Sequence, residues 1–375
     1  MGPLEGVRVL ELAGIGPCPM CGMLLAELGA TVLRIDRPRP SGLGFDVPLA
    51  NNFLQRSRPS IAVDLKRETG PALVLKLCER ADILIEGMRP GVMENLGIGP
   101  DACTRRNVAL VYGRVTGWGQ TGPLAGAAGH DLNYIGLTGA LHAIGRAGQA
   151  PTPPLNLVGD FGGGALYLSL GVVAALLNAR RSGRGQVVDA AMIDGAASLM
   201  TAAYALRSAG LSTDTRGENV LDGGAHFYDV YETRDGRHIA LAAIEPKFYA
   251  ELIERLGLDL DALPHSQRRE EWPGLKAKLA DAIRTRTRDE CVALLEGTDA
   301  CFAPVLSMEE APHHPHNRLR QTFVERDGHW QPNAAPRFSR TPSAVRQANV
   351  TATREHLEEW GLDDREIALA VTPPT

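Results

Sequence analysis

The chain has 375 residues, of which 44% are hydrophobic and 22% are charged, and its formal net charge is −5. Domains average about 150 residues, so this length predicts two or three domains, or one large domain with a smaller insert. The acidic balance excludes the strongly basic surface that binds a nucleic-acid backbone. The aromatic content of 5% argues against a stacking platform for single strands.

Three features predict a cytoplasmic protein. The first residues, MGPLEGVRVLELAG, lack the basic region and apolar run of a secretory signal. The longest apolar stretch, 165–177, is shorter than the roughly 20 residues that span a membrane. The six cysteines follow no disulfide pattern, as expected in a reducing compartment. We therefore expect no membrane and no nucleic acid among the partners.

The first half of the chain alternates short apolar strands with helices, which predicts an α/β fold with a parallel sheet. The expected strands cover 7–12, 31–36, 83–87, 108–117 and 186–192. A helix that ends at Leu28 and another over 69–80 lie between the first strands. The segment after Asp160 is apolar on all sides and predicts a buried helix, and a further helix is expected over 194–209.

The sequence pattern changes near residue 215, where a polar, glycine-rich connector begins. The alternating segment that follows contains Asp235-Gly236, a strong signal for a β-hairpin. A short helix is expected near the end, over 353–361. The predicted organisation is a large domain over 1–190 and 330–375, a linker over 191–222, and a small domain over 223–329.

Gly14 and Gly16 follow the first expected strand, and Asp36 lies 20 positions beyond Gly16. This spacing resembles half of a dinucleotide-binding fingerprint. However, Pro17 and Pro19 lack the backbone N–H groups that would bind a pyrophosphate. We therefore interpret the segment as a tight strand-to-helix turn that lines a cleft.

Basic residues gather where expected strands end. They are Arg34, Arg37, Arg39, Arg56, Arg58, Lys66 and Arg89. The carboxyl ends of parallel strands border the crevice in which ligands bind, so these clusters favour a polyphosphate ligand. The alternative is that each arginine belongs to a solvated face.

Two other motifs carry less chemistry. Cys18 and Cys21 form a CxxC at a helix start, but a second CxxC that would complete a zinc site is missing. We interpret them as small residues packed beneath a ligand. The histidines of APHHPHN, at 313, 314 and 316, lack nearby carboxylate or thiol partners. We expect no metal site.

Two segments place proton acceptors beside glycines. His130 precedes Asp131 at an apparent helix start in AGHDLNY, and Asp160 precedes three glycines in NLVGDFGGG. Asp160 could simply cap the following helix. Each glycine costs a helix about 1 kcal/mol relative to alanine, so we expect the glycines to allow close approach of a ligand. Free N–H groups there would suit a developing oxyanion.

Motifs along nearly the whole chain carry a resemblance. They are GPLEGVRVLELAGIGP, LRIDRP, SIAVDLK, RPGVMENLGIGP, GRVTGWGQTGP, GHDLNY, NLVGDFGGG, LDGGAHFYDVY, AAIEPKFYAELIERLGL, TDACFAPVLSMEEAPHHPHN and EEWG. The sequence resembles the family III CoA-transferases, the CaiB/BaiF superfamily, and is most similar to its racemase branch. It departs from the family's pattern at Asn95, at His226 and in the CPMC turn.

The resemblance implies a large Rossmann-like domain closed by the C-terminal tail, a small α/β domain, and a homodimer of interlocked chains. The implied partner is an acyl-CoA thioester, with no separate cofactor because CoA is part of the substrate. Arg89 comes from the strand-end clusters, and the resemblance supplies the other expected CoA-binding residues. The full set is Arg37, Val63, Asp64, Leu65, Lys66, Arg89, Ala128, Gly129, Asp131, Leu132 and Asn133. Residues 63–66 match a strand on the adenine side.

The resemblance also implies that His130 and Asp160 are catalytic bases, and that Glu245 from the other chain pairs with the histidine. A thioester carbonyl acidifies its α-hydrogen, so one base on each face can epimerise a 2-methyl-branched acyl-CoA through an enolate. We expect the Asp160 N–H to hold the enolate oxygen and Glu245 to orient His130. Two alternatives stay open: CoA transfer through an acyl anhydride on Asp160, and binding of CoA esters without catalysis.

Overall fold

The computed structural model describes residues 2–39, 42, 44–45, 47–48, 51–346 and 350–371. The chain divides into two compact units. The larger unit comprises Met1–Thr138, Leu155–Leu199 and Arg320–Thr375, and the smaller unit comprises Gly139–Pro154 and Met200–Leu319. The domain boundaries expected from the sequence stay a prediction.

The larger unit is built on a seven-stranded sheet in which every pair of neighbouring strands is parallel. The strands are β1 (Arg8–Leu12), β2 (Thr31–Asp36), β3 (Pro59–Ala62), β4 (Ile83–Glu86), β5 (Val111–Thr116), β6 (Val187–Ala191) and β12 (Val350–Thr351). Their order is β12-β3-β2-β1-β4-β5-β6. Without β12, this is the 3-2-1-4-5-6 order of Rossmann folds, so the predicted fold class is confirmed.

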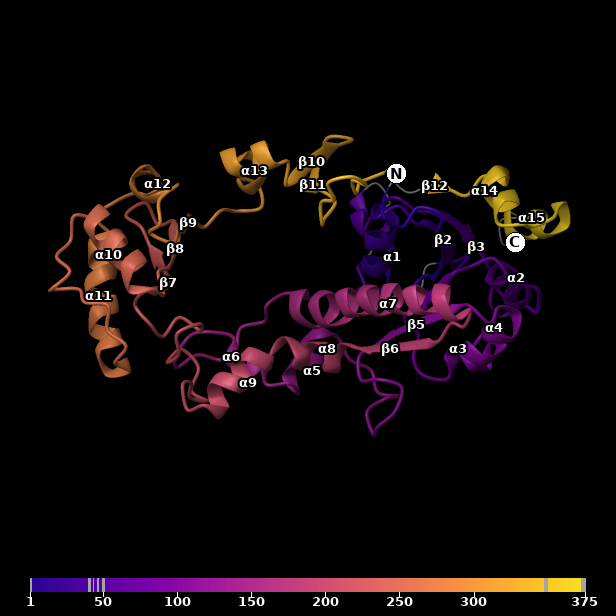
Figure 1. Cartoon of the computed structure of the whole chain (residues 1–375), viewed down its shortest axis with the longest axis horizontal. Helices are drawn as coiled ribbons and strands as arrows, with labels where there is room; N and C mark the ends of the chain where they lie inside the picture. The colour runs from indigo at the N-terminus through magenta and orange to yellow at the C-terminus, as the bar shows by residue number, and fades with distance from the viewer. Residues whose placement is uncertain are drawn as a thin grey trace. The chain divides into compact units, whose positions relative to one another are not determined.

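Helices cover both faces of this sheet because alternate strand residues point to opposite sides. Val9 of β1 packs in one core with α1 (Pro17–Glu27) and α7 (Leu166–Ser182). Its neighbour Leu10 packs in the other. That second core includes α2 (Thr69–Cys78), α4 (Pro100–Arg106) and the C-terminal helices α14 (Arg354–Glu359) and α15 (Asp364–Val371). The end of the chain thereby returns to the large unit (Figure 1).

Several shorter elements connect the strands and helices of the two units. They are η2 (Phe53–Gln55), α3 (Val92–Asn95), α5 (Asp131–Gly136), α6 (Ala140–Ala143), the π-helix η3 (Leu157–Ala165), η4 (Arg269–Glu271), η5 (Ala311–His313), α13 (Pro315–Arg320), β10 (Phe323–Arg326) and β11 (His329–Pro332).

Three arginines expected to face a phosphate are instead buried in ion pairs. Arg58 and Glu11 are both fully buried, and Arg58 Nε lies 2.8 Å from Glu11 Oε2. Arg56 pairs with Glu27 at 2.6 Å, and Arg34 pairs with Asp36 at 2.7 Å. A buried guanidinium needs a carboxylate partner, and these pairs supply it. The prediction was wrong for these three residues, whereas Arg37, Lys66 and Arg89 are exposed.

The helix expected over 194–209 is interrupted. It is divided at Met200 into α8 (Met192–Leu199) and α9 (Thr201–Ser208). Helix α8 belongs to the larger unit and α9 to the smaller one. No residue of α9 is buried in this single chain.

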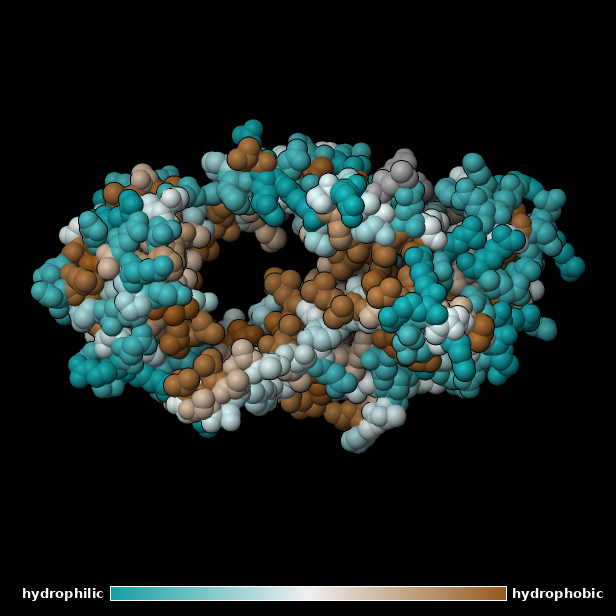
Figure 2. Space-filling model, viewed as in Figure 1, coloured by the Kyte–Doolittle hydropathy of each residue, from teal (hydrophilic) through white to brown (hydrophobic). Residues whose placement is uncertain are grey.

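The sequence predicted that the helix after Asp160 is buried on all sides. This prediction was wrong, because one side of the helix is exposed. Leu166, Leu170 and Leu177 lie on one stripe of α7 and are 52%, 68% and 61% exposed. Figure 2 shows hydrophobic surface in the region of α7. Together η3 and α7 form one helix, Leu157–Ser182, whose 26 residues are long and apolar enough to cross a membrane. A core helix meets the same test, and Leu168 and Val172 lie in the core. The cytoplasmic location and the absence of membrane contact stay predictions.

The smaller unit is built on a three-stranded antiparallel sheet of β7 (Tyr228–Glu232), β8 (His238–Ala242) and β9 (Phe302–Pro304). The hairpin turns at Asp235-Gly236, where Gly236 has a φ of 70°, so the predicted hairpin is confirmed. Its core contains aromatic residues of β7 and of the helices. These helices are α10 (Pro246–Arg255), α11 (Trp272–Ile283) and α12 (Arg288–Leu295).

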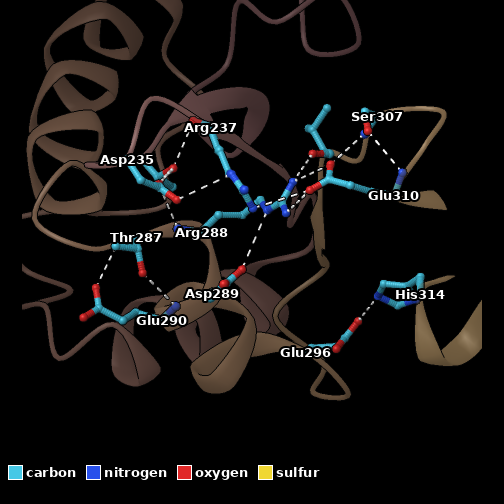
Figure 3. A network of polar contacts seen from close by, with 12 residues as sticks. Asp235, Arg237, Thr287, Arg288, Asp289, Glu290, Glu296, Ser307, Glu310 and His314 are labelled. Atoms are coloured by element: carbon cyan, nitrogen blue, oxygen red, sulfur yellow. Dashed lines mark hydrogen bonds and ion pairs between the residues drawn. The ribbon is translucent and has the colours of Figure 1, made fainter.

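A network of charged side chains ties the hairpin turn of this unit to α12 and to the segment after β9 (Figure 3). Arg288 donates through both terminal nitrogens to Glu310, at 3.0 and 2.6 Å. Its backbone N–H donates to Asp235. Hydrogen bonding from Arg288 lowers the pKa of Glu310 to about 2. The network lies within the small unit.

The three glycines after Asp160 serve helix packing. A Cβ on Gly163 would lie 2.7 Å from the Ala196 nitrogen of α8, and one on Gly164 would lie 2.9 Å from Pro17 Cβ of α1. Conversely, a Cβ on Gly195 of α8 would lie 1.9 Å from the Gly163 oxygen. The expectation that these glycines admit a ligand was therefore wrong, because neighbouring helices occupy the space beside them.

We predict that Gly195→Ala destabilises the large unit. The added methyl meets backbone that cannot yield locally, and such overpacking costs about 1–3 kcal/mol. Denaturant unfolding followed by circular dichroism measures this loss. Gly136→Ala is the matched control, because nothing lies within 4 Å of the Cβ position at that helical glycine. Equal unfolding midpoints for the two variants would contradict the close contact between η3 and α8.

Candidate active site at the carboxyl edge of the sheet

Most of the expected site residues follow the carboxyl ends of parallel strands. Gly16 follows β1, Arg37 follows β2, and Arg89 follows β4. His130 lies on the connection that follows β5. Because the strands are parallel, their carboxyl ends meet at one edge of the sheet. The order reverses between β1 and β4, and such a switch point is where open α/β sheets bind ligands.

His130 stands at the start of α5 with its side chain exposed. Its backbone N–H donates to Asn133 Oδ1 at 3.0 Å, and its carbonyl accepts from the Asn133 N–H at 2.8 Å. These reciprocal bonds fix the backbone at the helix start, and the residue that carries the imidazole is exposed at the edge of the sheet.

Aromatic residues support the segment before His130. The Tyr134 hydroxyl donates to the Gly129 carbonyl oxygen. The Tyr134 ring packs edge-on against Trp118, with centroids 4.8 Å apart. A Cβ on Gly117 would lie 2.0 Å from this ring, so only glycine leaves room for it. Tyr134 belongs to the GHDLNY motif but was not predicted to support the site.

Asp160 lies inside the π-helix η3, so the suggestion that it caps a helix was wrong; Asn156 occupies that position. The Asn156 side-chain amide donates to Asp160 Oδ2 at 3.2 Å. A Cβ on Gly16 would lie 2.9 Å from the same oxygen, so the glycine turn after β1 adjoins this carboxylate. The turn thus lines the site, as the sequence analysis interpreted it.

Asp131 connects the two segments that carry His130 and Asp160. Its carboxylate Oδ2 accepts from the Gly159 N–H at 2.6 Å and from the Asp160 N–H at 2.7 Å. Asp131 is 5% exposed, so its side chain faces the protein rather than solvent. The expectation that the Asp160 N–H holds an enolate oxygen was therefore wrong, because this donor is already bonded to a carboxylate.

The electrostatic environment makes Asp160 a better proton acceptor than an ordinary aspartate. Burial raises its pKa, and the negative charge of Asp131 raises it further. The hydrogen bond from Asn156 and the charge of His130 act in the opposite direction. A carboxylate with a raised pKa suits general base catalysis near neutral pH.

The expected CoA-binding residues divide into exposed and buried groups. Arg37 is exposed and contacts Met88 Sδ at 3.6 Å, which joins the ends of β2 and β4. Val63 is buried in the core, and Asp64 accepts from the Lys66 N–H at 3.0 Å. Residues 63–66 follow the end of β3 directly. The Val63 N–H donates to the Asp36 oxygen of β2 at 2.9 Å, which continues the pairing of the two strands, and Leu65 and Lys66 lie in a turn.

Other expected residues on this edge are exposed. They are Lys66, Arg89, Ala128, Leu132 and Asn133. Leu65 and Gly129 are half-buried. The exposed cations Arg37, Lys66 and Arg89 are available to an anionic ligand. The contacts of all these residues with CoA stay a prediction.

Glu245 belongs to the smaller unit, where it is exposed at the start of α10. Its carbonyl oxygen accepts from the Phe248 and Tyr249 N–H groups, both at 3.1 Å. Its pairing with His130 stays a prediction. His226 is fully buried in the same unit and bonds the Pro264 oxygen at 3.1 Å. Burial lowers the pKa of His226 to about 4, so this departure from the family pattern places a neutral histidine in a core.

The other motifs show no metal or disulfide chemistry within the described parts of the chain. Cys18 and Cys21 are free, buried thiols, and burial raises the pKa of Cys21 to about 12. Their packing in the core supports their interpretation as small filling residues. His314 Nε2 lies 2.8 Å from Glu296 Oε1. No group of three or more metal-ligating side chains occurs among the described residues.

Known proteins resemble this chain over almost its entire length. The model of the CoA-transferase family III matches residues 4–351. An alpha-methylacyl-CoA racemase from Mus musculus is 47% identical, with 97% of this chain and 95% of the relative covered. The same enzyme from Homo sapiens is 43% identical over the same shares of the two chains. The crystal structure of a CaiB/BaiF family protein from Brucella suis aligns with a TM-score of 0.80 and 25% identity, covering 96% of this chain and 100% of that one.

We predict that Asp160→Asn stabilises the protein at pH 7. A carboxyl whose pKa is raised on folding contributes stability that is present at low pH and lost as the pH rises through the folded pKa. The neutral amide avoids that loss. The denaturant midpoint of Asp160→Asn should exceed that of the unmodified protein at pH 7. This difference should shrink as the pH falls toward 3.8, the ordinary pKa of an aspartate.

Asp101→Asn makes the same chemical change at an exposed residue of α4 and serves as the control. We expect no comparable gain from it. A pH-independent difference between Asp160→Asn and the unmodified protein would show that Asp160 titrates as it does in the unfolded chain.

Proposed function

Because the chain belongs to CoA-transferase family III, we propose that it is an isomerase that epimerises the α-carbon of 2-methyl-branched acyl-CoA thioesters. The observation that carries the proposal is the Asp131 contact, which joins the His130 and Asp160 segments at the switch point of the sheet. The 47% identity to the mouse racemase supports the same conclusion.

The proposed reaction uses one base on each face of the α-carbon. One base removes the α-proton, the electron pair moves into the thioester carbonyl to form an enolate, and the other base returns a proton to the opposite face. Asp160 suits this work because burial raises its pKa toward the working range. His130 suits it because the imidazole is exposed and its backbone is already fixed.

The substrate is proposed to enter along the carboxyl edge of the sheet. Arg37, Lys66 and Arg89 would meet the phosphates of CoA, since the other strand-end arginines are paired in the core. The pantetheine would run along 128–133 toward Asp160. CoA is part of the substrate in this proposal, and the reaction needs no separate cofactor.

The alternative function is CoA transfer, which the family name itself supports. In that reaction the Asp160 carboxylate attacks the thioester carbonyl, the C–S bond breaks, and an acyl anhydride forms while CoA thiolate leaves. The presence of His130 on a segment that Asp131 bonds to Asp160 favours epimerisation, because a nucleophilic aspartate needs no second proton acceptor. Binding of CoA esters without catalysis leaves both groups unexplained.

We also propose that the active protein is a homodimer of interlocked chains. The apolar stripe of α7 is largely exposed in a single chain, and α9 has no buried residue. Apolar surface of this extent marks an interface. In the dimer, Glu245 of one chain would orient His130 of the other and set its tautomer.

We predict that His130→Ala slows α-proton exchange in deuterium oxide unequally for the two enantiomers of a 2-methylacyl-CoA. Each base serves one face, so the enantiomer that His130 deprotonates should lose about 10²–10⁴-fold in rate. Asp160→Ala should show the opposite bias. Exchange is measured by mass spectrometry on each pure enantiomer.

His316→Ala removes an exposed imidazole elsewhere and should leave exchange unchanged. Normal exchange from both enantiomers in His130→Ala would end the two-base proposal. If the unmodified protein transfers labelled CoA to a free acid and Asp160→Ala loses all turnover, the protein is a transferase instead.

We predict that mixed dimers recover activity if the site is shared between chains. Co-expressed His130→Ala and Glu245→Ala chains should form heterodimers with one intact site and one doubly damaged site. Their exchange rate per heterodimer should approach half that of the unmodified dimer. Activity no higher than that of either parent dimer would mean that both residues come from the same chain, and light scattering would check the dimer itself.

A further inference from the structure

The Asp131 side chain has no place among the reacting groups, yet it is buried between two of them. Its Oδ2 accepts from two consecutive N–H groups, at Gly159 and Asp160. A Cβ on Gly159 would lie 2.7 Å from the same oxygen, so glycine is required for this approach. The carboxylate therefore lies tightly against the backbone of the π-helix.

We propose that Asp131 is a positioning residue that fixes the Asp160 side chain relative to His130, an inference that rests on the proposed function. Because Asp131 follows His130 directly in the chain, its bond to the Asp160 N–H leaves a short covalent and hydrogen-bonded path between the two bases. Movement of one base relative to the other would break at least one of these bonds.

The π-helix explains why a side chain must supply this bond. The first N–H groups of a helix have no acceptor within it, and in η3 the first internal bond runs from the Phe161 N–H to the Asn156 oxygen. The Gly159 and Asp160 N–H groups precede that bond. Asp131 accepts from both, and a charged acceptor makes stronger hydrogen bonds than a neutral one.

The charge of Asp131 also acts on Asp160. Its second oxygen, Oδ1, is buried and has no hydrogen-bond partner among the described residues, so the charge is only partly compensated. The other titratable groups that interact with the Asp160 carboxyl are His130 and Tyr134. Helices α1 and α8 present groups to η3 that do not titrate, namely Gly16, Pro17, Met192 and Gly195. The charge of Asp131 thus adds to burial in raising the pKa of Asp160.

The test compares Asp131→Asn with Asp131→Ala in α-proton exchange across the pH range. The side-chain amide oxygen of the asparagine variant can still accept from the two N–H groups, so its rate at the optimum should stay within about 10-fold of the unmodified enzyme. The alanine variant loses the acceptor, and misplacing a base by about 1 Å costs on the order of 10²-fold.

The pH profile separates positioning from simple structural support. Without the Asp131 charge, Asp160 ionises at lower pH, so the acidic limb of the Asp131→Asn profile should move to lower pH. Asp101→Asn should leave the limb in place. An unmoved limb together with equal losses in the asparagine and alanine variants would overturn the proposal, since a structural role alone predicts that result.

A second measurement does not depend on catalysis. The gain in denaturant midpoint from Asp160→Asn at pH 7 should be smaller in the Asp131→Asn background, because the repulsion between the two carboxylates is already gone. An equal gain in both backgrounds overturns the inference. If the unmodified protein exchanges no α-proton while the gains differ, the proposed function fails and the coupling of Asp131 to Asp160 stands.

Discussion

Two consecutive backbone N–H groups, at Gly159 and Asp160, lie where the chain cannot satisfy them from within its own helix. The Asp131 carboxylate accepts from both. That requirement places the start of α5 against the start of the long helix Leu157–Ser182, and it brings the connection after β5 to the turn after β1. Gly159 is needed for the approach of Asp131, and Gly16 for the approach of Asp160. The candidate site is therefore a consequence of backbone hydrogen bonding as much as of side-chain chemistry.

The parallel sheet positions the segments that Asp131 connects. Its strand order places β1 and β4 side by side at the switch point, so the connections that follow them diverge and leave a crevice. Buried pairs such as Glu11–Arg58 occupy the interior of the same sheet. Burial raises the pKa of Glu11 to about 7 despite the nearby guanidinium, which shows how strongly this interior opposes charge. Burial likewise raises the pKa of Asp160, which therefore titrates differently from a surface aspartate.

The sequence predicted the strands well because their signal is local. Runs such as Ile83 to Ile85 are apolar on both faces, as strands covered by helices on both sides must be. The partners of Arg56 and Arg58 were not predictable in this way. Arg56 finds Glu27 across 29 positions, and Arg58 finds Glu11 across 47. A cluster of arginines has the same appearance in a sequence whether its members bind a phosphate or balance buried carboxylates.

The site could be predicted in its residue types but not in its internal bonding. His130 and Asp160 stood out through their motifs, whereas the bond from the Asp160 N–H to the Asp131 carboxylate was not predicted. No sequence pattern marks a π-helix, so the glycines of GDFGGG were interpreted as room for a ligand. In the structure they are room for α8 and α1. Gly195 is the signal that could have separated the two interpretations. It lies in α8, and a helical glycine there allows the close contact with Gly163 of η3.

The apolar stripe of α7 is a surface that a single chain leaves uncovered. One side of that helix packs Leu168 and Val172 into the core, while Leu166 and Leu170 on the other side are more than half exposed. Burying apolar surface stabilises a protein by roughly 25 cal/mol per Å², so a helix exposed in this way is costly unless something covers it. A membrane or a second chain could do so. The stripe is narrow, and the π-helix that continues it carries the half-buried Asp160, whose charge would be expensive in lipid. In the proposed dimer, a second chain would cover the stripe without that penalty, and it would also bring a carboxylate, Glu245, to the site of its partner.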